Sequence, residues 1–139
     1  MILQDVMTVT SQKEIAKNIF EMKLQGNLVG EITSPGQFVH VRVSEGFDML
    51  LRRPISVAEI DRTKNECTII YRAEGDGTRN LSKKAAGDQV NVLGPLGNGF
   101  PLAETEAGET AYLIGGGIGV PPLYELSKQL TAQGVKCVH

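Results

Sequence analysis

The sequence is poor in the residue types on which metal clusters, disulfide frameworks and nucleic-acid surfaces depend. It has 139 residues but only two cysteines, two histidines and no tryptophan. Cys67 and Cys137 lie far apart and form no CxxC pair, which excludes a zinc ribbon and a redox dithiol. Two thiols are also fewer than the four that an iron–sulfur cluster usually takes. The formal net charge of -2 provides no basic field for a nucleic acid or an anionic membrane surface.

Long apolar runs and a leader sequence are also missing. The longest weakly polar stretch, Ala111 to Leu123, is too short to cross a bilayer and is interrupted by glycines and prolines. The first residues carry no basic side chain before Asp5, so no signal peptide is expected. These absences predict a cytoplasmic protein with reduced cysteines and no membrane partner.

The first hundred residues alternate apolar and polar side chains with a period of two, which is typical of half-buried strands. The clearest runs are residues 20–24, 39–43, 67–72 and 90–92. Glycine- and proline-rich turns separate them, and short strands at this spacing predict a small antiparallel barrel or sandwich. One short helix is expected from Arg79 to Ala85, with Thr78 as its N-cap and Gly87 as its terminator.

The pattern changes after residue 104. A wholly apolar run at 111–114 predicts a strand buried in a parallel sheet, and a glycine loop and a leucine-faced helix follow it. A second strand begins near Val135, so this part reads as the opening of a βαβ unit. We therefore expect a β domain over 1–103 joined to the truncated start of an α/β nucleotide-binding domain over 104–139. The apolar faces of that piece should be partly exposed, and the segment after Phe100 should be protease-sensitive, self-associate or pack back on the β domain.

Two motifs are candidates for binding a phosphate-bearing ligand. Gly115-Gly116-Gly117-Ile118-Gly119 follows a strand and opens a helix, where glycines admit a pyrophosphate and the helix N-terminus favours an anion. A tight turn that binds nothing is the alternative. Arg53-Pro54-Ile55-Ser56 offers a guanidinium fork and a hydroxyl that both donates and accepts. An exposed arginine beside an edge strand is the alternative here.

A third candidate is Glu74 to Thr78, in which Gly77 and Thr78 stand at the start of the expected short helix. The strand before it ends in Ile70-Tyr71-Arg72, where Tyr71 is also a typical core residue. An ordinary glycine turn is the alternative. His40 and His139 have no partner at a metal or triad spacing, so no catalytic residue and no metal ligand is proposed.

In this order along the chain, the motifs resemble those of the ferredoxin-reductase type flavoprotein family. The stretches that carry the resemblance are Arg53-Pro54-Ile55-Ser56, Ile70-Tyr71-Arg72, Gly77-Thr78, Gly94 to Phe100 and Gly115 to Leu123. The resemblance implies a Greek-key barrel that binds FAD, followed by a doubly wound domain that binds NAD(H). It also implies a later segment that holds a [2Fe–2S] cluster, for which this chain has no ligands.

The resemblance also implies a role for each motif. Arg53 would pair with a phosphate of FAD, Ser56 would face the flavin ring, and residues 70–72 would contact FAD. Gly77 and Thr78 would hold the pyrophosphate, and residues 115–119 would meet the nicotinamide nucleotide. Pro54 and Ile55 complete the first motif, although many family members have a tyrosine where Ile55 stands.

The function that the resemblance implies is electron transfer. The intact subunit would pass electrons between NADH and a partner flavoprotein that oxidises dihydroorotate in pyrimidine biosynthesis, through FAD and the cluster. It would be an oxidoreductase component within a hetero-oligomer. One alternative is a sibling subunit of the same fold with another redox partner. A non-catalytic barrel fragment is the other.

Overall fold

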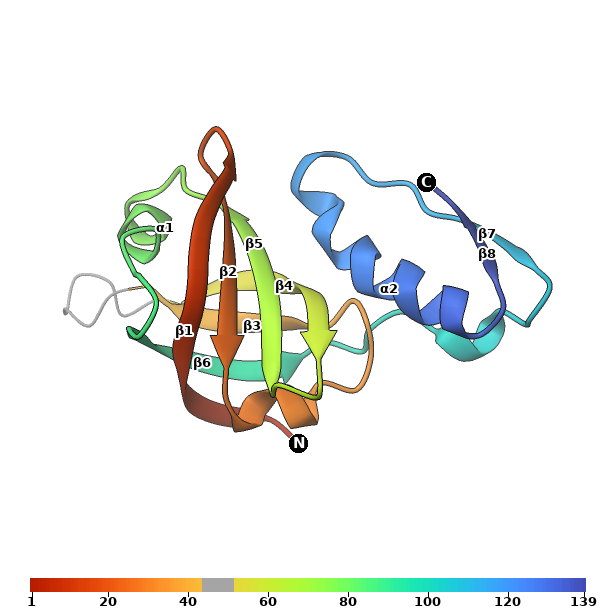
Figure 1. Cartoon of the computed structure of the whole chain (residues 1–139), viewed down its shortest axis with the longest axis horizontal. Coiled ribbons are helices and arrows are strands. Elements are labelled where there is room, and N and C mark those ends of the chain that lie inside the picture. The colour runs from red at the N-terminus through yellow and green to blue at the C-terminus, as the bar shows by residue number, and fades with distance from the viewer. Residues whose placement is uncertain (44–51) are drawn as a thin grey trace.

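A computed structural model describes residues 1–43 and 52–139 and contains a closed six-stranded antiparallel barrel (Figure 1). Around the barrel the strands follow the order β1-β2-β5-β4-β3-β6, in which β6 returns to lie beside β3 as in a Greek key. The predicted antiparallel barrel is therefore confirmed, and the sandwich is excluded. The strands are β1 (Leu3–Ala16), β2 (Ile19–Gln25), β3 (Phe38–Arg42), β4 (Arg52–Asp61), β5 (Glu66–Arg72) and β6 (Gln89–Leu96).

The barrel interior is filled by the apolar members of the alternating runs. Met22, Leu24, Val39, Val41 and Ile69 are all fully buried, as the period of two predicts. The short helix η1 (Asn27–Glu31) closes one end of the barrel with Leu28 and Val29. Helix α1 (Asp76–Leu81) covers the other end (Figure 1). Its Leu81 is fully buried in the barrel core.

The bounds predicted for the short helix are wrong. The helix α1 begins at Asp76, three residues before the expected start at Arg79, and ends at Leu81. Gly75 is its N-cap, and Thr78 stands inside the first turn instead of before it. The Thr78 hydroxyl accepts from the Gly75 N–H and donates to the Gly75 carbonyl, each at 3.2 Å, so this hydroxyl supports the cap from the third helical position.

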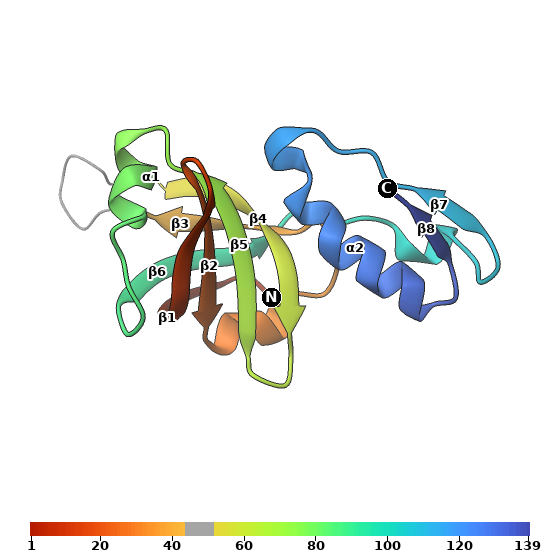
Figure 2. The ribbon, with the colours of Figure 1, turned by 45° about the horizontal axis from the view of Figure 1, so that its top comes forward.

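The C-terminal piece is a single parallel crossover beside the barrel (Figure 2). The short helix η3 (Leu102–Glu104) leads to β7 (Thr110–Tyr112), which pairs in parallel with β8 (Lys136–Val138). Between these strands the chain forms η4 (Gly117–Gly119) and α2 (Pro121–Ala132). Within the described residues no helix is both long and apolar enough to cross a membrane.

The predicted exposure of this piece is only partly correct. Tyr112 and Ile114 are 72% and 92% exposed, as expected for a strand pair covered on one face. Leu126 and Leu130 on α2 are buried instead, because β7 and β8 pack over them together with Val135. Helix α2 also packs against β4, so one of the three outcomes predicted for this segment is observed.

Candidate functional site

Strands β4 and β5 separate at one end of the barrel. They pair from Val57 opposite Ile69 to Asp61 opposite Glu66 and no further. Residues 52–56 of β4 therefore pair with β3 alone, while residues 70–72 of β5 pair with β2 alone. Pro54, which has no N–H to donate, lies in this one-sided part of β4, where a proline is tolerated. The separation opens the barrel wall at the point where two of the candidate motifs stand.

A pocket of about 280 Å³ lies at this opening, and we call it the β4–β5 cleft. It brings together residues from four of the sequence motifs. Its lining consists of Arg53, Pro54, Ile55, Ser56, Ile70, Tyr71, Arg72, Thr78 and Ile118. These residues come from four separate parts of the chain, so the fold unites motifs that the sequence keeps apart.

Among the described residues, Arg53 is the cation of the cleft for which no partner is found. Its guanidinium is exposed and makes no hydrogen bond or ion pair within residues 1–43 and 52–139. The neighbouring Arg52 differs, because it donates to the carbonyl oxygens of His40 (3.3 Å) and Asn91 (3.2 Å). Partial burial, with the nearby charge of Arg42, lowers the pKa of Arg52. Arg52 therefore stabilises the barrel, whereas Arg53 has its donors available for a ligand.

Ser56 lines the β4–β5 cleft, and Gly77 lies close to Arg53 beside it. The half-buried Ser56 hydroxyl has no hydrogen-bond partner within the described part of the chain. Gly77 is buried against the barrel rim, where a Cβ atom would lie 2.6 Å from Val43 Cγ2 and 3.8 Å from Arg53 Nε. Only glycine lets α1 approach the rim this closely, and this approach places its first turn beside Arg53.

Tyr71 contributes little of its ring to the cleft. The side chain is 3% exposed and stacks on Phe20, with ring centroids 5.9 Å apart. Its hydroxyl donates to Gln12 Oε1, and burial raises the pKa of this phenol. The predicted alternative of a core role for the Tyr71 side chain therefore agrees with its burial. Gln12, which the sequence analysis missed, also donates to the carbonyls of Leu81 (2.9 Å) and Lys84 (2.7 Å).

A second and larger hollow adjoins the cleft, and we call it the α2 groove. It has a volume of about 560 Å³ and lies between the outer barrel face and the start of α2. Ile70, Arg72 and Ile118 line both the cleft and the groove, so the two form one continuous surface. The remaining lining residues are Ile15, Ile19, Glu21, Ala58, Glu59, Thr68, Gly117, Val120, Pro121 and Tyr124.

The glycine loop lies between the groove and solvent. Gly117 lies near Arg72, since a Cβ atom on Gly117 would be 3.9 Å from Arg72 Nη2. Gly115 packs against Leu123, and a Cβ there would lie 2.8 Å from Leu123 Cδ1. Gly116 and Gly119 face open space, so their backbone is accessible to a ligand. The structure thus brings Gly117 and Ile118 to the cleft region and leaves the other three glycines outside it.

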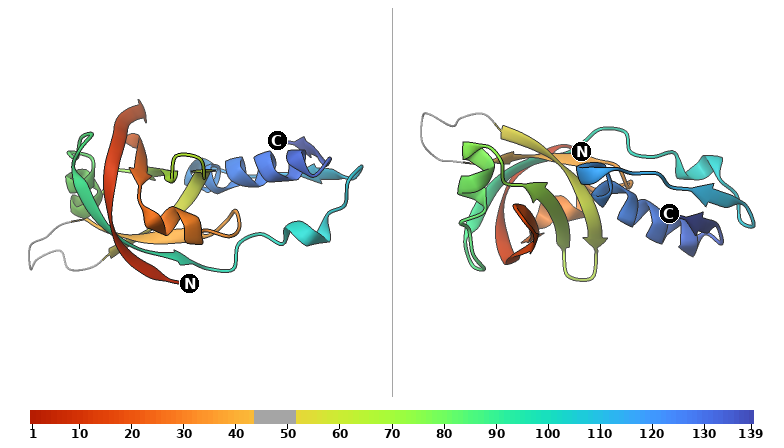
Figure 3. Two further views of the ribbon diagram at one scale, coloured as in Figure 1. Left: turned by 60° about the horizontal axis from the view of Figure 1, so that its bottom comes forward. Right: turned by 90° about the horizontal axis from the view of Figure 1, so that it is seen from above.

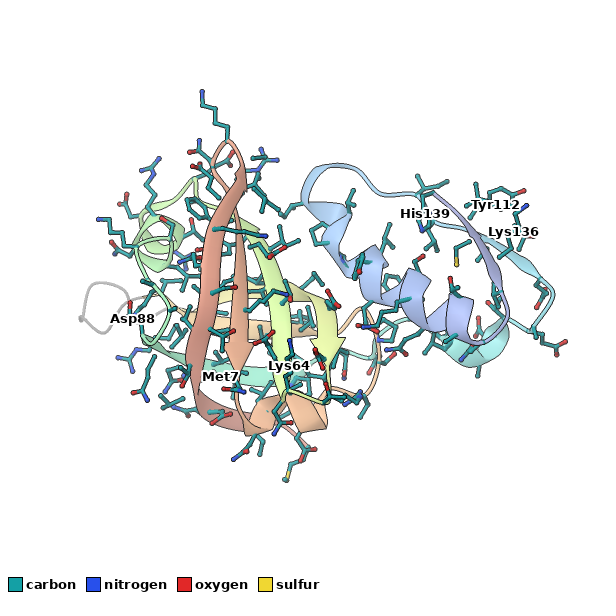
Figure 4. The ribbon with its side chains drawn as sticks, viewed as in Figure 1. Met7, Lys64, Asp88, Tyr112, Lys136 and His139 are labelled. Atoms are coloured by element: carbon teal, nitrogen blue, oxygen red, sulfur yellow. The ribbon has the colours of Figure 1, made fainter. Side chains whose placement is uncertain are left out.

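The far end of the C-terminal piece carries other exposed side chains. Figure 4 shows Tyr112 and Lys136 at the end of the piece that points away from the barrel. His139 lies nearby, with its Nε2 2.8 Å from Ser127 Oγ. None of these residues lines the β4–β5 cleft.

Comparisons with known proteins agree with the motif order. No family model matches the chain. Over all 139 residues it is 59% identical to the dihydroorotate dehydrogenase B (NAD(+)), electron transfer subunit of Bacillus mycoides. It is 60% identical to the same subunit of Bacillus cereus. The chain spans about half, 54%, of the length of each of these curated relatives.

Solved structures share the same arrangement. An NADH-dependent reduced ferredoxin-NADP oxidoreductase matches 96% of the chain with a TM-score of 0.83 and 29% identity, over 46% of its own length. An Amycolatopsis cytochrome P450 reductase matches 98% of the chain with a TM-score of 0.78 and 26% identity, over 42% of its length. The predicted resemblance to ferredoxin-reductase type proteins is therefore confirmed.

Proposed function

We propose that this chain forms the FAD-binding part of an electron-transfer subunit that works between NADH and a dihydroorotate-oxidising flavoprotein. The observation that carries the proposal is the meeting of four sequence motifs at the β4–β5 cleft. The identity of 59–60% to dihydroorotate dehydrogenase B electron transfer subunits favours this partner over other redox partners. In this proposal the FAD part covers residues 1–103, the start of the NAD(H) part covers 104–139, and the protein is cytoplasmic.

The side chains at the cleft fit a flavin dinucleotide. A flavin has apolar ring faces and a polar ring edge, and its dinucleotide carries a doubly charged pyrophosphate. Ile55, Ile70 and Ile118 provide apolar walls, and the unpaired Ser56 hydroxyl matches the polar edge. The unpaired Arg53 guanidinium beside Gly77 matches the pyrophosphate. The donor set and the apolar walls together suit FAD better than a small anion.

When bound, FAD would supply the chemistry that links two-electron and one-electron transfer. The residues of this chain would bind and orient it. Arg53, with the first turn of α1 at Gly77 and Thr78, would hold the phosphates. Ser56 would hydrogen-bond the ring edge, while Ile70 and Ile118 exclude water. Because hydride transfer needs no protein acid or base, the proposal assigns no catalytic side chain.

Two further cofactors enter the proposal at the level of the whole subunit. The exposed loop Gly115–Gly119 would contact NAD(H), with Gly116 and Gly119 leaving room for a pyrophosphate to approach the backbone. No residue of this chain is assigned to a [2Fe–2S] cluster, because two cysteines are too few to ligate one. Electrons would reach the catalytic dihydroorotate dehydrogenase subunit in a hetero-oligomer, which copurification of the two chains would test.

The visible absorbance spectrum of the purified chain tests flavin binding directly. We expect a yellow protein that releases FAD, identified by chromatography, on denaturation. A chain that stays colourless after incubation with FAD, yet has the circular dichroism of a folded β protein, would contradict the proposal. The same experiment then leaves a non-catalytic barrel fragment as the better description.

The substitution Arg53→Ala tests the phosphate contact. Loss of a charged hydrogen bond should weaken FAD binding by about ten- to a hundredfold. Riboflavin, which has no phosphate, should bind the variant and the parent chain equally. Lys64→Ala is the control, because Lys64 is exposed on the β4–β5 turn away from the cleft (Figure 4). Equal FAD affinity for the Arg53 variant and the parent, by fluorescence titration, would rule out this assignment.

A further inference from the structure

The edge of β4 has no strand neighbour where it passes beyond β3. Strand β3 pairs with β4 as far as Phe38 opposite Ser56, and the Val57 N–H still donates to the Gln37 carbonyl at 3.1 Å. Within the described part of the chain, residues 58–61 therefore have a strand neighbour on the β5 side alone. At Ile60 two side chains of α2 take the place of the missing strand. The Ile60 N–H donates to Glu125 Oε1 at 2.7 Å, and Lys128 Nζ donates to the Ile60 carbonyl at 3.2 Å.

The two side chains form a fully paired ionic cluster. Glu125 is only 1% exposed, and its second oxygen accepts from Gln129 Nε2 at 2.9 Å. Lys128 lies 3.2 Å from Glu125 and 3.6 Å from Glu59. Partial burial acts to lower the pKa of Lys128, but the two carboxylates outweigh it and the pKa is raised. Because an unpaired buried carboxylate is costly, this cluster defines one position for α2 on the barrel.

The apolar contact between α2 and the barrel lies outside both buried cores. Of the buried apolar residues of α2, Leu126 and Leu130 face β7 and β8 with Val135, whereas Pro121 lines the α2 groove together with Ala58 of β4. The buried core of the barrel is a separate cluster, and within the described residues no buried apolar cluster includes members of both. Figure 3 shows α2 beside β4, with the far end of the helix extending away from the barrel. Glu125 and Lys128 make the hydrogen bonds to Ile60 of β4, and these bonds are the polar and specific part of the attachment.

The position of α2 determines the position of the glycine loop. Pro121 and Pro122 open α2 directly after η4, and their fixed φ angles stiffen the junction. Ile118, at the centre of η4, lines both the β4–β5 cleft and the α2 groove. A rotation of α2 about its contact with Ile60 would therefore move Ile118 relative to Ile70 and Arg72.

We propose that Glu125 and Lys128 are positioning residues, which hold Ile118 over the β4–β5 cleft by binding the backbone of Ile60. They touch neither the proposed flavin nor a substrate, and act through α2 and the loop. This inference rests on the proposed function only where it concerns the flavin. The hydrogen bonds of Glu125 and Lys128 to Ile60 involve no ligand.

Amide hydrogen exchange by NMR tests the attachment without any ligand. In Glu125→Leu the Ile60 amide should exchange about tenfold faster or more, because its charged acceptor is lost. The loop amides of Gly117 and Ile118 should shift, while the barrel amides of Met22 and Ile69 stay unchanged. Glu125→Gln keeps an oxygen for the Ile60 N–H and should show a smaller effect. Glu104→Gln, an exposed acid on the same piece, is the control.

Iodide quenching of flavin fluorescence tests the positioning in the chain loaded with FAD. We expect stronger quenching in Glu125→Leu and Lys128→Met than in Glu104→Gln, since the displaced loop would expose the ring. A uniformly destabilised barrel would change FAD affinity without changing quenching of the bound fraction. The Lys128 variant provides a second route if the Glu125→Leu chain does not fold.

The outcomes distinguish the attachment of α2 at Ile60, the positioning of Ile118 and the proposed function from one another. An unchanged Ile60 exchange rate in both Glu125 variants would overturn the attachment. Faster Ile60 exchange with unchanged loop shifts, or with unchanged quenching of bound flavin, would overturn the positioning role. Failure of the parent chain to bind FAD would count against the proposed function, while the exchange and loop-shift data would still decide whether Glu125 and Lys128 position the loop.

Discussion

The thiol of Cys67 lies inside the barrel on β5, and only 1% of the residue is exposed. Burial, with a smaller contribution from the charge of Glu66, raises its pKa from 9.0 to about 12. Tyr71 lies further along the same strand, and burial raises its pKa above 10.0 in the same way. Both groups are thus held in their neutral forms, which makes the fold sensitive to alkali.

The direction of this sensitivity follows from proton linkage. Above pH 9 the unfolded chain loses the Cys67 proton while the folded chain keeps it, so stability falls as pH rises toward 12. The fall should approach ~1.4 kcal/mol per pH unit for this one group. In Cys67→Val the fall should begin near pH 10, where Tyr71 starts to contribute. Urea unfolding from pH 7 to 11 measures this, and identical curves for the two chains would contradict the assignment.

Among the elements, α1 is held to the barrel by one side chain from a distant strand. Gln12 on β1 donates to the carbonyls of Leu81 and Lys84 and accepts from the Tyr71 hydroxyl. Replacing it by leucine removes three hydrogen bonds and takes away the partner of the Tyr71 hydroxyl and of the Lys84 carbonyl, while the Leu81 carbonyl still accepts from the Lys84 N–H at 3.1 Å. We expect Gln12→Leu to lower the free energy of unfolding by about 2–4 kcal/mol, measured by urea denaturation.

Two other variants separate the hydrogen bonds of Gln12 from its packing. Tyr71→Phe removes one of the three bonds and should cost about 1 kcal/mol. Gln25→Leu is the matched control, since Gln25 is exposed at the end of β2 and bonds only the Lys64 carbonyl among the described residues. A Gln12→Leu chain as stable as the control would show that α1 is held by apolar packing around Leu81 alone.

The elements also show what the sequence could predict. Strands β2, β3, β5 and the centre of β6 alternate apolar and polar residues, and this pattern located them. Strand β1 carries no such signal over its second half, residues 10–16, because these residues extend past the core and are polar or exposed on both faces. The limits of α1 were missed because the Thr78 hydroxyl supports the cap from within the helix.

The motifs of the site could be predicted from the sequence, but their meeting at one cleft could not. Arg53, Ser56, Thr78 and Ile118 each belong to a motif with its own chemistry, and the sequence indicated them one by one. Their meeting point depends on the separation of β4 from β5 beyond Val57, which is a property of strand pairing and has no local signal. Gln12, Glu125 and Lys128 were missed for the same reason, since their partners lie at least 59 residues away, apart from the i,i+3 and i,i+4 contacts of α2.

At the scale of the whole molecule, the chain has two cores of very different size. Within residues 1–43 and 52–139, twenty buried residues form the barrel cluster, whereas three form the second, namely Leu126, Leu130 and Val135. The β7–β8 pair is covered by α2 on one face, and Tyr112 at the end of β7 is exposed (Figure 4). Ile114, two residues after the end of β7, is also exposed. A small parallel sheet normally has both faces covered, so these side chains form an apolar surface without a partner among the described residues.

This surface predicts association at raised protein concentration. Tyr112 is 72% exposed at the end of β7, and Ile114, just beyond it, is 92% exposed. The outer edges of the β7–β8 sheet have no strand neighbours among the described residues. Sedimentation velocity from micromolar to near-millimolar chain should show a rising weight-average mass. Ile114→Lys should hold the chain as a monomer over that range, because a charge at the centre of the contact must be desolvated. Ile2→Lys, at an apolar residue that is 59% exposed near the N-terminus and lies outside the β7–β8 pair, should leave the association unchanged. A parent chain that stays monomeric throughout would mean that the exposed strand face is too small to drive self-association.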